Sequence, residues 1–388
     1  MTIAPADQAA RRAVYAVFAL NGLCFATLAS RYPDLRSALH LSNGSLGLLL
    51  LVIALGSMVG MPASGHLIER YGADRVLRTA AGLVAGSMVV AGVGAATGAV
   101  PLVALGLGGY GIGTGTWDVA VNVEGAGVER LLGQSIMSRF HAGWSVGTFS
   151  GAGVGAIAAA VGVPLPVHFG IVALAATTVV HVQSRAFASI SAEPTETLRP
   201  SRSAWLEPRT LAIGAMVLAF ALAEGSANDW LALGLVDGYG TPHWVGVLGF
   251  ALFVAAMTVG RLAGPPALDR FGRTRMLLAS SLAALVGILV VVWSGLAALA
   301  VVGIVLWGLG AALGFPVGMS AGADDPLRAA RRVSVISTIG YGAFLGGPPL
   351  LGFVADRVGT LNSLLVVAGA MVPAALLSLS VRRTRRPS

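Results

Sequence analysis

The sequence predicts an all-α membrane protein with twelve transmembrane helices in two six-helix halves. Three observations predict this class: 56% of the 388 residues are hydrophobic, only 11% are charged, and the mean hydropathy is +0.81. An ordinary soluble protein carries about 25% charged residues, so a chain of this length with so few charges cannot cover its surface in water. The composition excludes a soluble enzyme, a disordered protein and a nucleic-acid-binding domain, and it indicates a polytopic membrane protein.

Twelve apolar runs are long enough to cross a bilayer, which takes about 20 residues in a helix. They are continuous and about twice too long for β-barrel strands. We expect the first run to be a retained span, because it is longer than the apolar region of a signal peptide and lacks a clear cleavage site. The predicted spans are 13–30, 46–64, 76–96, 100–121, 138–161, 165–182, 211–233, 244–263, 276–293, 296–320, 334–354 and 361–381.

The positions of the basic residues indicate the orientation of these spans. All 25 basic residues are arginine, and they lie in the gaps between apolar runs. With the N-terminus in the cytoplasm, Arg31, Arg36 and Arg357 fall outside and the other 22 fall inside. Because cytoplasmic loops are enriched in Arg and Lys, we expect a multi-pass protein of the plasma (inner) membrane with both termini in the cytoplasm.

A polar stretch divides the spans six from six. Residues 183–209 are rich in Ser, Pro, Glu and Arg, and we expect them to form a cytoplasmic linker. The N-terminal half is then 1–182 and the C-terminal half is 210–388.

A short motif recurs at intervals of three spans. Residues 65–75 read GHLIERYGADR after span 2, and residues 265–275 read PPALDRFGRTR after span 8. A shorter copy, GFVADRVG, occupies 352–359 after span 11. The repeated unit is therefore three helices, used four times in alternating orientation, which is typical of transporters.

Twelve spans, a central loop and this motif resemble the major facilitator superfamily. The resemblance implies alternating access between two six-helix halves, with the motif acids latching the cytoplasmic side shut. Two positions depart from the family pattern: Asp74 stands where a basic residue is common, and Pro265 stands where a glycine is expected. The gating residues carried over are Gly65, Glu69, Arg70, Gly72, Arg75, Asp269, Arg270, Gly272, Arg273 and Arg275.

A second, narrower resemblance is to a bacterial branch of that superfamily related to proton-coupled sugar symporters. The residues that carry it are WDVAVNVE at 117–124, VER at 128–130, SRFHAGWS at 138–145, and Glu224-Gly225 with Asp229-Trp230 in span 7. This resemblance implies transport and gives only a hint of the substrate.

Charged groups inside spans are costly and indicate function by default. Asp118 lies in span 4, and Asn122 follows one helical turn later on the same face. Asp118 either takes up a proton or binds substrate, with Asn122 orienting it, or is a structural acid paired with Arg130 or Arg139. His141, early in span 5, is either a proton relay or a neutral side chain bonded to a neighbouring helix.

Glu224 is the deepest acid, and burial makes a carboxyl group easier to protonate. We expect Glu224 to be the coupling or substrate carboxylate, with Asn228 on its face one turn on and Asp229 nearer the outside as an outer-gate residue. The competing interpretation is a structural carboxyl satisfied by Ser226 or by neighbouring helices. Six aromatic residues are candidates for stacking on a sugar ring: Tyr110, Trp117, Trp144, Trp230, Trp307 and Tyr341.

Small residues in two spans indicate close helix crossings. Gly111 with Gly115, and Gly151 with Gly155, form G-x-x-x-G pairs. We also expect the Gly and Pro residues at 314–316 and 346–349 to break spans 10 and 11.

These features predict a secondary transporter without enzymatic activity, most simply a proton symporter of a polar small molecule such as a sugar. Proton-coupled efflux of an amphipathic metabolite or drug is the alternative, and a non-transporting sensor on the same scaffold is a third. A remote rival is an intramembrane serine hydrolase, because residues 143–147 fit G-x-S-x-G with His141 nearby. We expect no catalytic residue, no metal site and no cofactor beyond the proton gradient. The expected partners are the solute and the lipid bilayer, with no nucleic acid, and we expect a monomer.

Overall fold

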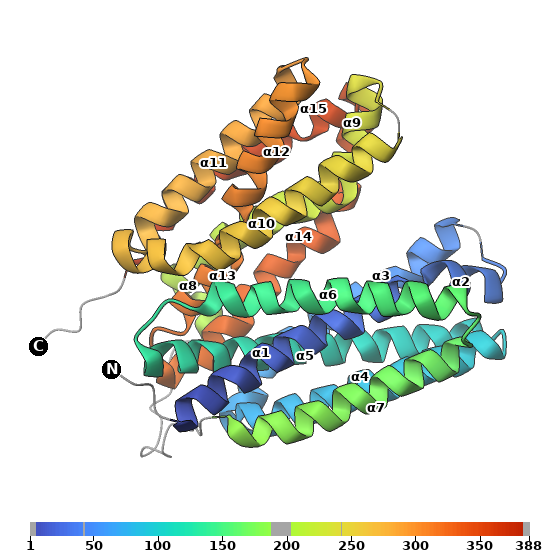
Figure 1. Ribbon diagram of the computed structural model, residues 1–388. Helices are drawn as coiled ribbons and strands as arrows, with labels where there is room; N and C mark the ends of the chain where they lie inside the picture. The colour runs from blue at the N-terminus through green and yellow to red at the C-terminus, as the bar shows by residue number, and fades with distance from the viewer. Residues whose placement is uncertain (1–4, 42, 188–202, 242, 383–388) are drawn as a thin grey trace, which may run out of the picture. The chain divides into compact units, whose positions relative to one another are not determined.

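The computed structural model describes residues 5–41, 43–187, 203–241 and 243–382 (Figure 1). All regular secondary structure in these ranges is helical, and no strand occurs in them. The central part of the predicted linker, 188–202, lies outside the described residues.

The helices of the described residues fall into twelve continuous segments that correspond to the twelve predicted spans. The first six are α1 (Pro5–Ala29), α3 (Asn43–Tyr71), α4 (Ala73–Ala96), α5 (Val100–Leu132), α6 (Met137–Ala160) and α7 (Leu165–Gln183), with the short α2 (Tyr32–Ala38) after α1. The last six are α8–η3–α9 (Pro208–Ser226, Ala227–Leu231, Ala232–Tyr239), α10 (His243–Phe271), α11 (Arg273–Trp293), α12–α13 (Ala297–Ala311, Gly314–Gly322), α14 (Ala329–Val358) and α15–α16–η5 (Thr360–Ser363, Leu365–Leu377, Ser378–Val381). Short 3₁₀ turns lie at η1 (Ser184–Ala186), η2 (Ala204–Leu206) and η4 (Pro326–Arg328).

Ten of these segments are long and apolar enough to span a membrane by length and composition. The remaining two are α5 and α6, which contain 33 and 24 residues and are therefore long enough. Both are rich in glycine, and α6 also carries several hydroxyl side chains. The twelve-span fold is consistent with this result, because small residues inside a bundle serve close packing rather than contact with lipid.

Several helices extend beyond their predicted ends, and two of these extensions bear on the candidate site. Span 4 was expected to end at residue 121, but α5 continues to Leu132 and buries Glu124 and Glu129, which lie beyond that predicted end. Span 8 was expected to end at residue 263, but α10 runs through Pro265 and Pro266 to Phe271. Prolines are tolerated in transmembrane helices, so they are weak end signals there.

The breaks inside helices also differ from expectation. Span 10 is interrupted between α12 and α13, next to the predicted Gly and Pro residues. Span 11 is one continuous helix, α14, in spite of Pro348 and Pro349. Span 7 contains a π-helical turn, Ala227–Leu231, that no sequence signal indicated.

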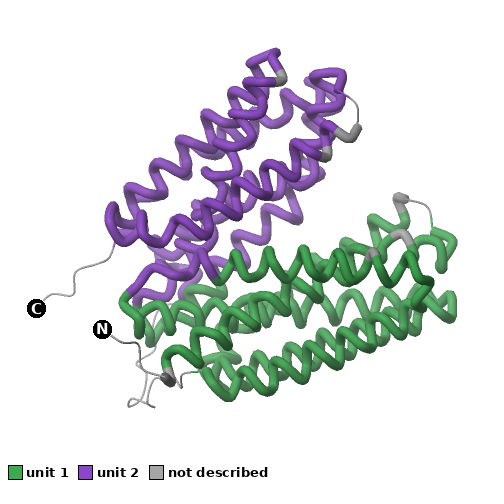
Figure 2. Tube along the Cα trace, in the orientation of Figure 1, with its two compact units in different colours: residues 1–133, 140–199, 325–334 green, residues 134–139, 200–324, 335–388 purple. Residues whose placement is uncertain are grey.

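The chain forms two compact units (Figure 2). Unit 1 comprises residues 1–133, 140–199 and 325–334, and unit 2 comprises 134–139, 200–324 and 335–388. The two units therefore follow the two halves of the sequence, except that a short segment from each half belongs to the other unit.

The units repeat the same packing scheme. In unit 1, α3 and α4 pack on α5, and α4 packs on α7. In unit 2, α10 and α11 pack on α12 in the same way, and α11 packs on α16. The glycines that end spans 2, 8 and 11 also share one backbone conformation, with φ of 84°, 80° and 85° at Gly72, Gly272 and Gly359. The recurrence confirms the repeat inferred from the motif.

The predicted glycine pairs lie at close crossings in unit 1. A Cβ at Gly111 or Gly115 would meet the backbone of α3, and a Cβ at Gly151 would meet the backbone of α1. Large apolar side chains such as Phe149 and Leu174 are instead exposed, at 83% and 71%. Lipid covers such side chains in a membrane protein, so the structure separates a close-packed interior from an apolar exterior.

Candidate functional site

In unit 1, Asp118, Asn122 and His141 form a continuous hydrogen-bonded chain. Nδ2 of Asn122 donates to the backbone carbonyl of Asp118 at 2.9 Å and lies 3.3 Å from its carboxylate Oδ1. Oδ1 of Asn122 lies 3.1 Å from Nε2 of His141, which comes from α6. Because an amide oxygen can only accept, Nε2 carries the hydrogen in this arrangement. The structure thus brings three predicted site residues from two helices into one group.

This group is enclosed by the helices of unit 1. Asn122 is fully buried, His141 is 9% exposed, and the ring of Phe18 lies against the imidazole with the ring centroids 4.9 Å apart. A net change of charge in such an environment is costly unless a neighbouring group compensates it. The arrangement can therefore pass or hold a proton only together with a rearrangement of its partners.

In unit 2, Glu224 pairs with Arg261 across α8 and α10. Nη2 of Arg261 donates to Oε2 of Glu224 at 2.9 Å, and the side chains are 3% and 14% exposed. Glu224 lies at the middle of the continuous helical segment Pro208–Tyr239. Arg261 lies ten residues before the end of α10, or about 15 Å along the axis. The ion pair therefore sits at membrane depth.

Arg261 is the principal site residue that the sequence interpretation missed. It was assigned to a cytoplasmic segment, and the count of 22 inner arginines included it. The structure overturns that assignment, because α10 continues for ten residues beyond Arg261. The signal was present in the sequence, since Arg261 stands inside the predicted span 244–263, and an arginine within a span should have been paired with the deepest acid.

The residues after Glu224 do not keep the α-helical register that the sequence predicted. Ala227–Leu231 is a π turn, and it carries Asn228 and Asp229, which are both exposed in unit 2. The prediction that Asn228 lies on the Glu224 face one turn on assumed an uninterrupted α-helix, and the π turn interrupts that helix. Of the competing interpretation, Ser226 does not satisfy Glu224, because its Oγ donates to the carbonyl of Leu222 at 2.5 Å, whereas a neighbouring helix does, through Arg261 of α10. π turns are rare and occur often at functional sites.

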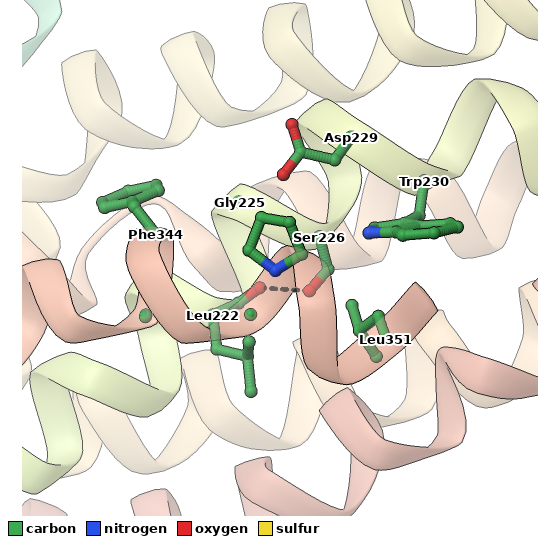
Figure 3. Close-up of a pocket in the computed structure, with 10 residues that line it drawn as sticks. Leu222, Gly225, Ser226, Asp229, Trp230, Phe344 and Leu351 are labelled. Carbon is green, nitrogen blue, oxygen red and sulfur yellow. Dashed lines mark hydrogen bonds between the residues drawn. The ribbon is translucent and has the colours of Figure 1, made fainter. Parts of the chain in front are cut away.

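A narrow pocket lies beside this π turn, between α8–η3 and α14 (Figure 3). Ser226, Asp229 and Trp230 line one side, and Phe344 and Leu351 line the other. Of the other aromatic candidates, Tyr110, Trp117 and Trp307 are at most 2% exposed, so they pack in the cores of the units and are not available to stack on a solute.

The motif loops make matching contacts at the helix ends. In unit 1, Oε2 of Glu69 accepts from Nε of Arg331 at 2.6 Å, and Gly65 lies against the backbone of Arg331. In unit 2, Oδ1 of Asp269 accepts from the backbone N–H of Ser135, just before α6, at 3.0 Å. Glu69 is therefore paired with an arginine, and Asp269 accepts from a backbone N–H just ahead of a helix.

The other motif residues hold the turns themselves. Arg70 lies over the ring of Tyr71 and Arg270 lies over the ring of Phe271, at 5.3 and 5.2 Å from the centroids. Arg273 donates to Asp324 at 2.6 Å, which Arg209 also contacts at 2.7 Å. Asp74, the departure from the family pattern, pairs with Arg78 one turn further along α4. Arg75 and Arg275 lie in the first turns of α4 and α11.

The G-x-S-x-G pattern lies within the continuous helix α6. Oγ of Ser145 donates to the backbone carbonyl of His141 at 3.4 Å, and the His141 imidazole bonds Asn122. A nucleophile elbow requires a strand, a sharp turn and a helix, so this segment does not have the geometry of a serine hydrolase.

Comparisons with known proteins agree with this architecture. The profile of the Major Facilitator Superfamily matches residues 14–343. An uncharacterized transporter, y4wD, of Sinorhizobium fredii is 34% identical, with 89% of this chain and 91% of that protein covered. An uncharacterized MFS-type transporter of Yersinia pestis is 32% identical, with 95% and 93% covered.

Solved structures show the same fold at low identity. The MFS transporter FucP in the outward conformation has a TM-score of 0.80 at 14% identity, with 96% of this chain and 98% of that chain covered. The proton:xylose symporter XylE has a TM-score of 0.72 at 14% identity, with 95% and 94% covered. From its helices, its repeats and these matches, the chain belongs to the major facilitator superfamily, a family of multi-pass membrane transporters.

Proposed function

We propose that this transporter couples the uptake of a polar solute, such as a sugar, to the entry of protons across the plasma membrane, with both termini in the cytoplasm. The observation that carries the proposal is the buried ion pair of Glu224 and Arg261 at membrane depth. Buried charges of this kind are costly to maintain in a membrane and mark the paths of ions and substrates.

The pair supplies a physical means of coupling. In this structure the carboxylate of Glu224 accepts a hydrogen bond from Arg261, and a proton bound to the same carboxylate would take the place of that interaction. Removing one charge of a buried pair leaves the other uncompensated, at a cost of about 3–5 kcal/mol. Protonation of Glu224 therefore favours a different arrangement around Arg261, and alternating access can use that difference. The group of Asp118, Asn122 and His141 is the second candidate for proton transfer.

The chemistry of unit 2 favours a polar solute over the competing function, efflux of an amphipathic compound. An efflux site is expected to be an apolar pocket with a single acid. The described part of unit 2 carries Glu224, Asn228, Asp229 and Arg261 along a short stretch of α8, η3 and α10, and these groups support a polar solute. The narrow pocket beside the π turn is mostly apolar, with Asp229 as its one acid, so the comparison rests on the polar groups around the pocket rather than on its lining. FucP and XylE, which are named as proton symporters of fucose and xylose, share the fold, and this likeness supports the proposal by analogy.

The test is solute-driven proton movement in proteoliposomes that contain the full chain. Solutes are first selected by thermal shift from sugars, sugar acids, nucleosides and amphipathic cations, since a ligand at about a hundred times its Kd adds about 2.7 kcal/mol to stability. A selected sugar should then carry protons inward with the wild type. Glu224→Gln should still bind the sugar, but it should lose proton movement and the dependence of transport on pH.

Asp237→Asn is the matched control, because Asp237 lies on the same helical segment and contacts Thr360 rather than Arg261. It should retain wild-type coupling. Unchanged proton movement in Glu224→Gln would reject the coupling role. A response only to amphipathic cations would replace uptake by efflux.

We also propose that Asp269 helps to keep the cytoplasmic side closed, since it holds the N–H of Ser135 ahead of α6. Asp269→Asn removes the charge on this acceptor and should increase maleimide labelling of a cysteine introduced at the cytoplasmic ends of the helices. Equal labelling rates in Asp269→Asn and the wild type would contradict this role.

A further inference from the structure

The pocket beside the π turn contains both a hydrogen-bond acceptor and a hydrogen-bond donor. The proposed proton-coupling mechanism uses neither of them. Asp229 contributes a carboxylate, which can only accept when ionised. Trp230 contributes an indole Nε1–H, which can only donate, and this atom is buried without a hydrogen-bond partner among the described residues. Figure 3 shows the nitrogen edge of the indole turned toward Ser226.

The facing helix adds an acceptor. Phe344 and Pro348 both line the pocket from α14. A proline has no N–H, so Pro348 cannot give the carbonyl of Phe344 the hydrogen bond that a residue four positions later normally provides. Gly347 lines the same wall, and a Cβ at this position would meet Leu222 of α8 at 3.0 Å.

The position of Asp229 requires a polar neighbour. Asn228 and Asp229 are exposed, although they lie within the membrane-spanning segment Pro208–Tyr239. A charged side chain at this depth faces water or a polar ligand, because contact with lipid is too costly. The π turn therefore borders an aqueous path.

We propose that this pocket is a recognition subsite for a hydroxyl group of the transported solute, so that the solute is a neutral polyhydroxylated molecule. A hydroxyl donates to Asp229 or to the Phe344 carbonyl and at the same time accepts from Nε1 of Trp230. An ammonium group has no acceptor for the indole N–H, and a carboxylate is repelled by Asp229. The pocket is narrow, so it can take no more than a single hydroxyl group of the solute.

This subsite rests on the proposed transport of a polar solute and adds the chemical class of that solute. The test uses the detergent-solubilised full chain and three matched probe series: neutral hexoses, pentoses and inositol; the corresponding amino sugars; and the corresponding sugar acids. The neutral series should contain a probe that raises the Tm, and its amine and acid analogues should have weaker effects.

Two variants then test the residues. Trp230→Phe keeps the ring and removes the N–H, and Asp229→Asn keeps an acceptor oxygen and removes the charge. Each should raise the probe concentration for half-maximal shift by about tenfold, the effect of roughly one hydrogen bond. The matched control Trp293→Phe, at an exposed position at the end of α11, should leave this concentration unchanged. The same variants should leave the Tm without probe close to the wild-type value.

Three outcomes would overturn the subsite: no shift with any neutral probe, a stronger shift with an amino sugar that Asp229→Asn abolishes, or unchanged probe binding in Trp230→Phe. Failure of the subsite is distinct from failure of the proposed function. If a selected solute still moves protons in the wild type while Trp230→Phe binds it normally, transport stands and the subsite is wrong.

Discussion

At the scale of single residues, the ion pair of Glu224 and Arg261 makes a prediction about stability as well as transport. Removing one partner of a buried pair should lower the free energy of unfolding by about 3–5 kcal/mol, because the remaining charge is left without compensation. Glu224→Leu and Arg261→Met should each show this loss. The double variant should be more stable than either single variant, because it leaves neither charge buried.

The measurement is thermal or denaturant unfolding of the four proteins in the same detergent, followed by tryptophan fluorescence. Strict additivity of the two single effects would show that the side chains do not interact and would contradict the pair.

Individual site residues were predictable where helical spacing or the energetic cost of a buried charge can be judged from the local sequence alone. Asp118 with Asn122 follows from i,i+4 spacing in a helix, and Glu224 follows from the cost of a buried charge. The bond between Asn122 and His141 was not predictable, because it joins α5 to α6 and depends on how those helices pack. Arg261 was missed because Pro265 and Pro266 resemble a helix end, while the surrounding bundle allows α10 to continue.

At the scale of secondary-structure elements, close crossings of helices depend on glycine. In α6, a Cβ at Gly151 would meet the carbonyl of Leu23 on α1, whereas a Cβ at Gly153 would meet nothing within 4 Å. Gly151→Ala should therefore destabilise the protein by about 1–3 kcal/mol through overpacking. Gly153→Ala should be neutral or stabilising by up to about 1 kcal/mol, because alanine loses less conformational entropy in a helix.

Thermal unfolding of these two variants beside the wild type checks the prediction, since both changes add the same methyl group to the same helix. Equal Tm values for the two would contradict the crossing.

The elements themselves were largely predictable, because length and hydropathy define spans without reference to partners. Their ends were less so: α5 continues to Leu132 because its last turns are buried against protein, so polar residues such as Glu124 do not end it. The π turn at Ala227–Leu231 was not predictable from composition, since one inserted residue in a helical turn leaves no periodic signal across so short a segment.

At the scale of the whole molecule, the distribution of arginine predicts the topology. Thr97 lies between α4 and α5 and Gln134 between α5 and α6, and both are exposed. With a cytoplasmic N-terminus, Thr97→Cys faces outward and should react with a membrane-impermeant maleimide on intact cells. Gln134→Cys faces inward and should react only after the cells are opened.

The native Cys24 is buried, so the wild-type protein gives the unlabelled background. Labelling of Gln134→Cys on intact cells would reverse the proposed orientation.

Three helix pairs are joined by a single glycine, at Gly72, Gly272 and Gly359, each with φ near +80° and ψ near 150°. This backbone conformation is essentially restricted to glycine. A one-residue connection is too short to allow the two helices to move independently. Neither helix of a pair can therefore slide or tilt far unless its neighbour moves with it. Each pair should therefore behave as one mechanical part, such as α3 with α4. In such a connection, a displacement of one span also displaces the next span. The relative movement of helices that transport requires therefore has to occur at other connections in the chain.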